Sequence, residues 1–439
     1  MRRLTQIYEW DIKLRTLSPL RIGDGDNDVL LDQYHRPFIP GTSLAGAFRS
    51  YLKNSQYTYL LSTLFGEKSS YRPKEGLLFT DAFLEGDYRD SFRPGVRISG
   101  KTKTVEEGAY FERHFIAPGA SFRFKLTLMC LDEENQEQWK AVTHLLYALH
   151  HGGIHLGAQT SIGGGRVEIE SCLYNHYDCN QLDDLEAYVH QTKKPKPFTF
   201  TEDFQPESRL QFLIKAKTAT PLLIASHKDY DSRKADAIYM KNEKGQAYIP
   251  GSSLKGVLRH GVERIINALS LKEGHKYVES IFGQYHNHTS HKARAASIQF
   301  QDTLLTNCDG KNVTYYRIAI NPLTGGNKDG ALLNEETIEG NFDIKIDLFY
   351  SEKDEHLYVA GALLLFALRD LALKDLSLGS RASIGYGFID VEEIEVQLEE
   401  KRLLLSIEEE KIEDPGGLLN LFDQALNRAR QSSEVGKHV

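Results

Sequence analysis

The sequence predicts a mixed α+β protein in which one domain occurs twice in tandem. Its 439 residues are enough for two to three domains, each able to bury its own core. Residues 38–49 read FIPGTSLAGAFR, and residues 248–259 repeat them as YIPGSSLKGVLR. Three further motif pairs follow in the same order, with spacings that grow slowly from 210 to 222 residues. Because chance similarity would not keep this order, we interpret the chain as a duplicated domain with small loop insertions.

The elements of each copy follow one order. Alternating apolar residues predict a first strand. The proline of the IPG segment then ends a short strand, and the following Ser or Thr is expected to cap a helix with apolar residues at four-residue spacing. A second helix leads into a glycine-rich element and a final strand. The expected first strands are 6–17 and 209–218, the second helices 138–150 and 356–373, and the last strands 165–169 and 387–394. This order is typical of a ferredoxin-like, RRM-like βαββαβ domain.

A short stretch rich in lysine and proline separates the two copies. It reads KKPKP at 193–197, which predicts a semi-extended linker. We therefore expect a first domain at 1–190, a linker at 191–208, a second domain at 209–395 and an acidic tail at 396–439. In the tail, the PGG segment is expected to break the chain before a short helix from Leu418 to Arg430. The tail is expected to be a solvated appendage, with a regulatory role as the alternative.

Composition excludes several classes of protein. No window approaches the roughly 20 uncharged apolar residues of a membrane span, and the N-terminus lacks a signal-peptide core. The four cysteines are scattered without a CxxC pair, so neither a disulfide framework nor a structural zinc site is expected. No Ser-His-Asp signature, Walker loop or dinucleotide fingerprint occurs. We expect a soluble cytoplasmic protein with no membrane partner.

The net charge of −8 is unevenly distributed. Residues 390–439 hold 6 basic and 13 acidic residues, so −7 of the charge lies in the tail. The rest of the chain is close to neutral, and binding to a polyanion would require local basic patches.

Two elements of each copy are candidate anion sites. Glycines in the glycine-rich element leave room for a phosphate and expose N–H groups, although such glycines also form simple tight turns. The start of the helix after IPG offers N–H groups and a favourable dipole, although basic residues there can also be merely solvated. The candidate residues are Gly164 and Arg166, Arg381 and Gly385, and, around the helices, Ser43, Arg49, Ser253, Lys255 and Arg259.

Long hairpins between strands provide the third candidate. Residues 93–103 carry four basic residues and no acidic one, among them Arg97, Lys101 and Lys103. The second copy has a weaker equivalent around Arg317. A basic hairpin can clamp a nucleic-acid backbone, and a solvated loop is the alternative.

Aspartates cluster before each IPG segment. Aligning the strand that follows places Asp28 opposite Asp236, with two more residues in the turn of the second copy and with Asp26 as a rival in the first. A carboxylate that both copies place in one loop can serve a phosphodiester as a base or a metal ligand, although any one of them can be a turn former. The histidines His286, His288 and His291 lie close together without a partner of metal-binding spacing.

The motifs taken together resemble the RAMP superfamily of CRISPR proteins. They are the IPG(T/S)SL(A/K)G segments, LFG at 64–66 with IFG at 281–283, and the LG…SIGGG and LG…SIGYG elements. The chain is most similar to Cas-seven-type backbone subunits of type III effector complexes, and a tandem of two is similar to the doubled subunit of type III-D systems. The resemblance implies a palm with a thumb hairpin in each copy.

The resemblance also implies partners and chemistry. Such subunits stack along a CRISPR RNA, pair it with a target single-stranded RNA, and assemble with neighbouring backbone subunits, a large signalling subunit and a small subunit. An aspartate before IPG supports target cleavage with Mg²⁺ or another divalent metal, which assigns catalysis to Asp28 and Asp236. Cleavage would proceed by attack of the 2′-hydroxyl. A non-catalytic scaffold that binds CRISPR RNA remains open, as does an endonuclease that processes precursor RNA with His155 as base.

Overall fold

The structure is a computed structural model, and it describes most of the chain. The described residues are 4–23, 28–66, 76–98, 105–131, 135–200, 209–225, 235–284, 294–308, 310, 312–350 and 356–434. The chain divides into two compact units. The first comprises Met1–Val96 and Gly108–Glu207, and the second comprises Arg97–Glu107 and Ser208–Val439. Helices and sheets occur in both units, which confirms the mixed α+β class.

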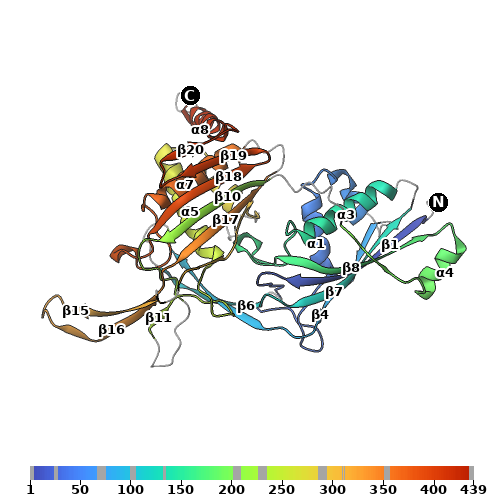
Figure 1. Cartoon of the computed structure of the whole chain (residues 1–439), viewed down its shortest axis with the longest axis horizontal. Coiled ribbons are helices and arrows are strands. Elements are labelled where there is room, and N and C mark those ends of the chain that lie inside the picture. The colour runs from blue at the N-terminus through green and yellow to red at the C-terminus, as the bar shows by residue number, and fades with distance from the viewer. Residues whose placement is uncertain are drawn as a thin grey trace. The chain divides into compact units, whose positions relative to one another are not determined.

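The first unit is built around a long antiparallel sheet (Figure 1). Its strands are β1 (Gln6–Thr16), β2 (Phe38–Ile39), β3 (Gly76–Phe79), β4 (Ala82–Glu85), β7 (Ser121–Cys130), β8 (Val167–Asp178) and β9 (Lys196–Pro197), with β5 (Asp90–Ile98) and β6 (Val105–Ile116) in a separate hairpin. Its helices are α1 (Gly41–Leu52), α2 (Leu61–Phe65), α3 (Asn135–His150) and α4 (Leu182–His190), with 3₁₀ turns at Thr58–Leu60 and Thr160–Ile162.

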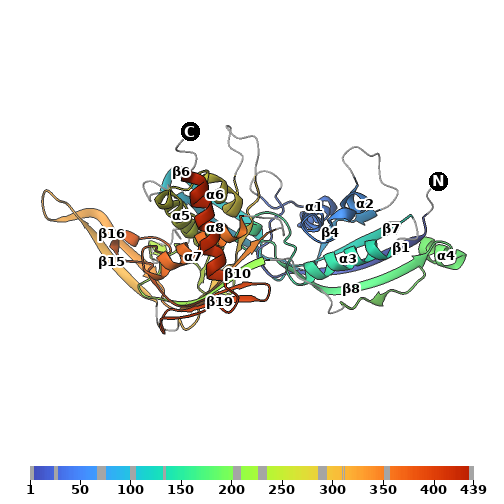
Figure 2. The same ribbon diagram turned by 90° about the horizontal axis from the view of Figure 1, so that it is seen from above.

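The centre of this sheet follows from the alternation of β1. Trp10, Ile12 and Leu14 lie on one face and are fully buried, while the intervening charged residues face outward. β1 pairs with β7 on one side and β8 on the other, and the sheet order is β2-β4-β7-β1-β8-β9. Helices α1 and α3 lie next to each other on one side of this sheet (Figure 2).

The second unit repeats this arrangement with longer helices. Its strands are β10 (Arg209–Thr218), β11 (Ala237–Ile238), β12 (Tyr248–Ile249), β13 (Ile298–Phe300), β14 (Thr303–Leu304), β15 (Val313–Ile320), β16 (Asn327–Thr337), β17 (Asn341–Phe349), β18 (Ile389–Leu398), β19 (Lys401–Ser406) and β20 (Lys411–Glu413). Its helices are α5 (Gly251–Leu269), α6 (Gly274–Phe282), α7 (Leu357–Ala372) and α8 (Leu418–Glu434), with a 3₁₀ turn at Ala382–Ile384. The order β13-β17-β10-β18 matches β3-β7-β1-β8 of the first unit, and β12 pairs with β14 as β2 pairs with β4.

Each unit inserts a hairpin directly before a strand that pairs with its first strand, β7 in the first unit and β17 in the second. In the first unit β5 pairs with β6, and in the second β15 pairs with β16. The second hairpin projects away from the body of its unit in both views (Figures 1 and 2).

The helix that follows each IPG segment buries the residues expected from its spacing. Leu44, Phe48 and Leu52 of α1 are fully buried, and α5 buries Leu254 and Leu258 in the same way. A stripe of buried residues at this spacing faces the sheet and anchors the helix.

The acidic tail belongs to the core of the second unit. β19 extends the main sheet next to β18, and α8 packs against α7. Leu418, Phe422 and Leu426 of α8 are buried in the main hydrophobic cluster of this unit. A Cβ on Gly361 of α7 would lie 2.7 Å from the Phe422 ring, so the two helices are in close contact. The expectation of a solvated appendage is therefore wrong, because α8 has an apolar face that charge counting did not reveal.

Part of the expected linker is also packed. Lys196 and Pro197 form the edge strand β9 beside β8. The Phe198 ring stands edge-on to the Trp10 ring, with 6.4 Å between the ring centroids. The Phe200 ring stacks on the His150 ring, with 4.8 Å between the centroids. The linker residues up to 200 thus cover the first unit. No described helix is long and apolar enough to cross a membrane.

Candidate functional site

The glycine-rich loops, residues 156–165 and 378–387, have the same shape in both units. Gly165 and Gly387 have φ of 76° and 77°, and a Cβ on either would lie 1.9 Å from the carbonyl oxygen of Leu156 or Leu378. Only glycine fits at these two positions. Their N–H groups donate to Pro19 O at 2.9 Å and Pro221 O at 3.0 Å, which fastens each loop to the segment after the first strand.

The glycines predicted to face phosphates use their N–H groups inside the loop. Gly164 N donates to Gln159 O at 3.2 Å, and Gly385 N donates to Ala382 O at 3.0 Å. The expectation of exposed glycine N–H groups is therefore wrong, because the 3₁₀ turn of each loop consumes them. Each loop instead presents a polar side chain from a residue in the left-handed region, Gln159 in the first unit and Arg381 in the second.

The start of each IPG helix is occupied by a carboxylate of the same unit. Asp81 Oδ1 accepts from Gly41 N at 2.7 Å, and Asp302 Oδ1 accepts from Gly251 N at 2.9 Å. Neither helix has a hydrogen bond from the side chain of its own N-cap residue, which is a proline. Two expectations are corrected here: the cap comes from a distant aspartate, and the helix start already holds an anion.

The serines of these segments are half-buried at the helix start. The backbone N–H of Ser43 donates to Pro40 O, and that of Ser253 donates to Pro250 O, both at 2.9 Å. They shape the first turn of the helix.

The basic residues of the IPG helices differ between the units. Burial, assisted by the nearby charge of Arg259, lowers the pKa of Lys255 to about 8. Arg259 Nε donates to Glu263 Oε1 at 3.0 Å, one turn further along α5. Arg49 of α1 is half-buried, and the first unit has Ala45 at the position of Lys255. The structure places Lys255 and Arg259 together on α5.

The structure also brings Arg317 and Arg381 together, from the second hairpin and the second glycine-rich loop. Arg381 Nε donates to Glu335 Oε1 at 2.7 Å, and Arg317 Nε lies 3.4 Å from Glu335 Oε2. The Arg317 guanidinium also lies over the Tyr386 ring, 4.7 Å from its centroid. Glu335 is 1% exposed, so a buried carboxylate joins the two arginines.

The basic residues predicted on the first unit are less well defined. Arg166 is half-buried, and its backbone N–H donates to Ser18 Oγ at 2.8 Å. Arg97 lies in β5, with its side chain outside the described part of the structure, and Lys101 and Lys103 lie outside the described residues.

The aspartates before the IPG segments align in a different register from the expected one. The bridges that close this turn are Gly23–Val29 and Leu31–Pro37 in the first unit and Ala225–Tyr239 and Lys241–Ala247 in the second. From Val29 onward each bridged residue has its counterpart 210 positions later, so the second copy has no extra residues between this point and the IPG segment, and its insertion lies before Tyr239. The pairing of Asp28 with Asp236 is therefore wrong. Asp28 corresponds to Ile238, and its rival Asp26 lies outside the described residues.

Asp236 is fixed to the base of the second hairpin. Its Oδ2 accepts from Asn334 N at 3.0 Å, and its own N–H donates to Asn334 O at 2.8 Å. Asn334 lies on β16, where Ala237 and Ile238 of β11 pair in parallel with the next two residues. The carboxylate is thus held where the aspartate-bearing loop meets the hairpin.

Asp28 takes part in a cluster that the sequence did not reveal. His114 of β6 lies between two carboxylates, with Nδ1 2.5 Å from Asp28 Oδ1 and Nε2 2.6 Å from Asp90 Oδ1. Its ring stacks on Phe92 of β5 at 4.7 Å. Burial acts to lower the pKa of His114, but the hydrogen bonds to Asp28 and Asp90 outweigh it and raise this pKa. The His114 hydrogen bond, with that from Val29 N, lowers the pKa of Asp28.

A protonated His114 satisfies this geometry, because an imidazolium has two N–H donors for the two carboxylates. The cluster therefore ties Asp28 to the base of the first hairpin. Its counterpart in the second unit is a contact between Asn312 Nδ2 and Glu336 Oε1 at 3.4 Å. In the sequence, His114 has no neighbouring motif that would mark it as a site residue. Only the pairing of β6 with β5 shows that it lies beside Asp90.

The remaining histidine predictions have mixed outcomes. His155 Nδ1 lies 3.2 Å from Gly164 O, inside the first glycine-rich loop. His286, His288 and His291 lie outside the described residues. Among the residues that the structure describes, no three His, Cys, Asp or Glu side chains are arranged to hold a metal ion.

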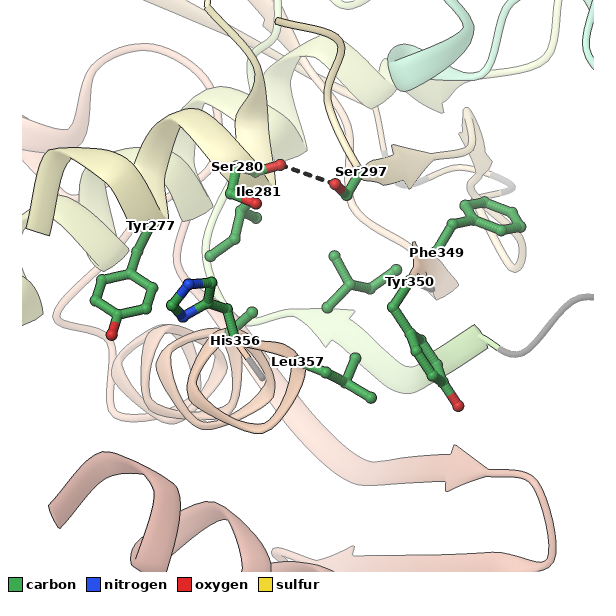
Figure 3. Close-up of a pocket in the computed structure, with 10 residues that line it drawn as sticks. Tyr277, Ser280, Ile281, Ser297, Phe349, Tyr350, His356 and Leu357 are labelled. Atoms are coloured by element: carbon green, nitrogen blue, oxygen red, sulfur yellow. Dashed lines mark hydrogen bonds between the residues drawn. The ribbon is translucent and has the colours of Figure 1, made fainter. Parts of the chain in front are cut away.

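A pocket of the second unit lies between α6, β17 and α7 (Figure 3). Tyr277, His356 and Tyr350 line it, and Ser297 Oγ donates to Ser280 O at 2.9 Å beside it. None of its lining residues was among the predicted site residues.

Comparison with known proteins agrees with the duplication. The family model described as RAMP superfamily matches residues 13–168 and 215–390, one match in each unit. The two matches cover more than half of the chain. A comparison with curated proteins finds no match.

Proposed function

The chain belongs to the RAMP superfamily, and from this premise we propose that it is a doubled backbone subunit of a type III CRISPR RNA-guided complex. Each unit would be a ferredoxin-like palm with a thumb, the hairpin β5–β6 or β15–β16. The CRISPR RNA would run along the chain and pair with a target RNA, and other effector subunits would complete the complex. Sequence selection then comes from base pairing, while the protein contacts the RNA backbone.

The observation that carries this proposal is the repeated junction of the aspartate-bearing loop, the hairpin and the glycine-rich loop. In each unit the aspartate-bearing loop is hydrogen-bonded to the base of the hairpin, through Asp28 and His114 or through Asp236 and Asn334. The glycine-rich loop is joined to the same hairpin. Because the chain has one such junction in each unit, the two units could contact one RNA in the same way at two successive places.

Target cleavage is the finer part of the proposal. We assign it to Asp236 in the second unit and, because Asp28 aligns with Ile238, to the rival Asp26 in the first. The target's own 2′-hydroxyl would attack the adjacent phosphorus, the bond to the 5′-oxygen would break, and the products would be a 2′,3′-cyclic phosphate and a 5′-hydroxyl. A carboxylate at this position can take up the hydroxyl proton or hold a Mg²⁺ that stabilises the developing charge. Asp236 fits either role, since it lies on a loop fixed by backbone hydrogen bonds.

The experiment is a cleavage assay on the complex assembled with guide RNA. A labelled complementary RNA should be cut in Mg²⁺ at positions fixed by the guide, and a single 2′-deoxy substitution at a cut nucleotide should abolish that cut alone. Guide and target binding without any cut would make the chain a scaffold. Cutting of precursor RNA by the chain alone would make it a processing nuclease. A complex that retains no guide RNA would refute the proposal.

A further inference from the structure

The second unit contains a buried carboxylate that the proposed cleavage does not use. Glu335 of β16 is 1% exposed and contacts two arginines, Arg381 of the glycine-rich loop and Arg317 of the neighbouring strand β15. Arg381 binds through Nε at 2.7 Å and Nη2 at 2.6 Å to the same oxygen, Glu335 Oε1. Such a pair holds the planar guanidinium in one orientation.

The two arginines keep exposed guanidinium surface in spite of this contact. The Arg381 side chain is 45% exposed and that of Arg317 is 29% exposed. Each guanidinium has five N–H donors; Arg381 directs Nε and Nη2 at Glu335 Oε1, and Arg317 Nε lies 3.4 Å from Glu335 Oε2 without a hydrogen bond to it. The stack of Arg317 on the Tyr386 ring restricts this side chain further. The cluster therefore presents fixed donors and a net charge of +1.

The first unit makes the same connection with an arginine on the hairpin and a neutral glutamine on the loop. The isolated bridges Leu20–Ile116 and Leu222–Ile338 place equivalent hairpin residues 222 positions apart, so Glu335 corresponds to Arg113 and Arg381 to Gln159. With the Gln159 amide oriented so that its oxygen faces Arg113, this oxygen accepts from Arg113 Nη1 at 2.9 Å and from Nε at 2.8 Å. Both units thus join the left-handed residue of the loop to the hairpin, and both leave one net positive charge there.

We propose that Glu335 is a positioning residue that presents Arg317 and Arg381 as one fork for a single phosphate of the RNA backbone. The inference rests on the proposed function, because it takes RNA as the ligand. A buried acid beside an RNA site would by charge alone weaken binding. Ordering long side chains on binding is unfavourable. The presence of Glu335 is explained if holding the two arginines in place favours RNA binding by more free energy than its repulsion of the phosphate costs.

This explanation predicts that removing the negative charge of Glu335 weakens RNA binding, whereas simple electrostatics predicts that it strengthens it. Replacing Glu335 by Gln removes a negative charge and keeps the shape of the side chain. Loss of the fixed fork should weaken RNA binding about tenfold, which is the effect of one lost charge-assisted contact. Glu336→Gln is the matched control, because it removes the same charge from the adjacent position of β16, whose side chain contacts Asn312 instead. The control should bind RNA as well as the wild type or better.

The test measures binding of a fluorescently labelled guide RNA to the purified full-length chain at several salt concentrations, with thermal unfolding to verify each fold. Weaker binding by Glu335→Gln, together with unweakened binding by Glu336→Gln, is the expected result. Tighter binding by both variants would overturn the inference and leave the proposed function intact. If Glu335→Gln does not fold, Arg381→Gln decides, and unchanged RNA affinity in that variant would also overturn the inference. A wild-type chain and complex that bind no RNA would overturn both proposals.

Discussion

Replacing Lys255 by methionine is expected to stabilise the protein and to weaken its binding to RNA. The pKa of Lys255 is about 8, against an ordinary value of 10.5. The folded protein therefore disfavours the charged amine by roughly 3 kcal/mol, which screening by water around this half-buried side chain reduces to about 1 kcal/mol. Methionine keeps the length and the apolar stem of the side chain without the charge.

The pH dependence of stability tests independently whether the Lys255 amine destabilises the folded protein. Because the pKa of Lys255 is lower in the folded state, the unfolded chain binds more protons between pH 8 and 10.5. Wild-type stability should therefore rise with pH through this window, and the advantage of Lys255→Met should be full below pH 8 and vanish above 10.5. Urea denaturation of both proteins at several pH values measures this difference.

RNA binding should change in the opposite direction. An amine that contacts a phosphate releases about 0.7 of a counterion from single-stranded RNA, so the slope of log affinity against log salt should fall by about that amount in Lys255→Met. Lys276→Met is the control, since Lys276 is exposed on α6 and pairs only locally with Glu273. A Lys255→Met protein that is destabilised and retains the wild-type salt slope would refute this reasoning and make the lysine structural.

Three further predictions follow from contacts of single side chains. Asp302→Ala should cost about 1 kcal/mol of unfolding free energy, because Gly251 N at the start of α5 loses its acceptor; an unchanged denaturation midpoint would contradict this. Phe422→Ala should cost roughly 3 kcal/mol, since the ring is 3% exposed against α7, and a loss below about 0.5 kcal/mol in the same assay would show that α8 is detached. Because the pKa of His114 is raised above 6.5, its contribution to stability is complete below that pH and is lost as pH rises through the raised pKa. Thermal unfolding of His114→Gln should lack this decline, and a decline equal to that of the wild type would exclude His114 as its source.

The duplication could be predicted from sequence because its signals are local. The IPG segments and glycine-rich loops depend on backbone geometry, such as the positive φ at Gly165 and Gly387, and geometry of this kind restricts residue type directly. The helix caps were missed because Asp81 and Asp302 lie 40 and 51 positions beyond the N–H groups that they bind. A signal was nevertheless present, since Phe79-Thr80-Asp81 and Phe300-Gln301-Asp302 occupy matching places in the two copies.

The aspartate register failed for a different reason. Asp28-Val29 and Asp236-Ala237 look alike as letters, but bridges across the turn determine which residues are equivalent. A strand slip of two residues preserves the facing of side chains, so the alternation of apolar residues could not detect it. The partners of His114 and Glu335 depend on pairing within a hairpin and on the loop beside it, which a single sequence does not specify.

The most direct test of two equivalent sites is a map of cuts in a labelled target RNA, made with the assembled complex, guide RNA and Mg²⁺. Wild type, Asp26→Ala, Asp28→Ala and Asp236→Ala would be compared, with target binding measured for each. We expect Asp26→Ala and Asp236→Ala each to lose one different cut, and Asp28→Ala to retain both, because Asp28 corresponds to Ile238. Loss of a cut in Asp28→Ala with both cuts intact in Asp26→Ala would contradict the register, and unchanged cuts in Asp236→Ala would contradict catalysis by the second unit.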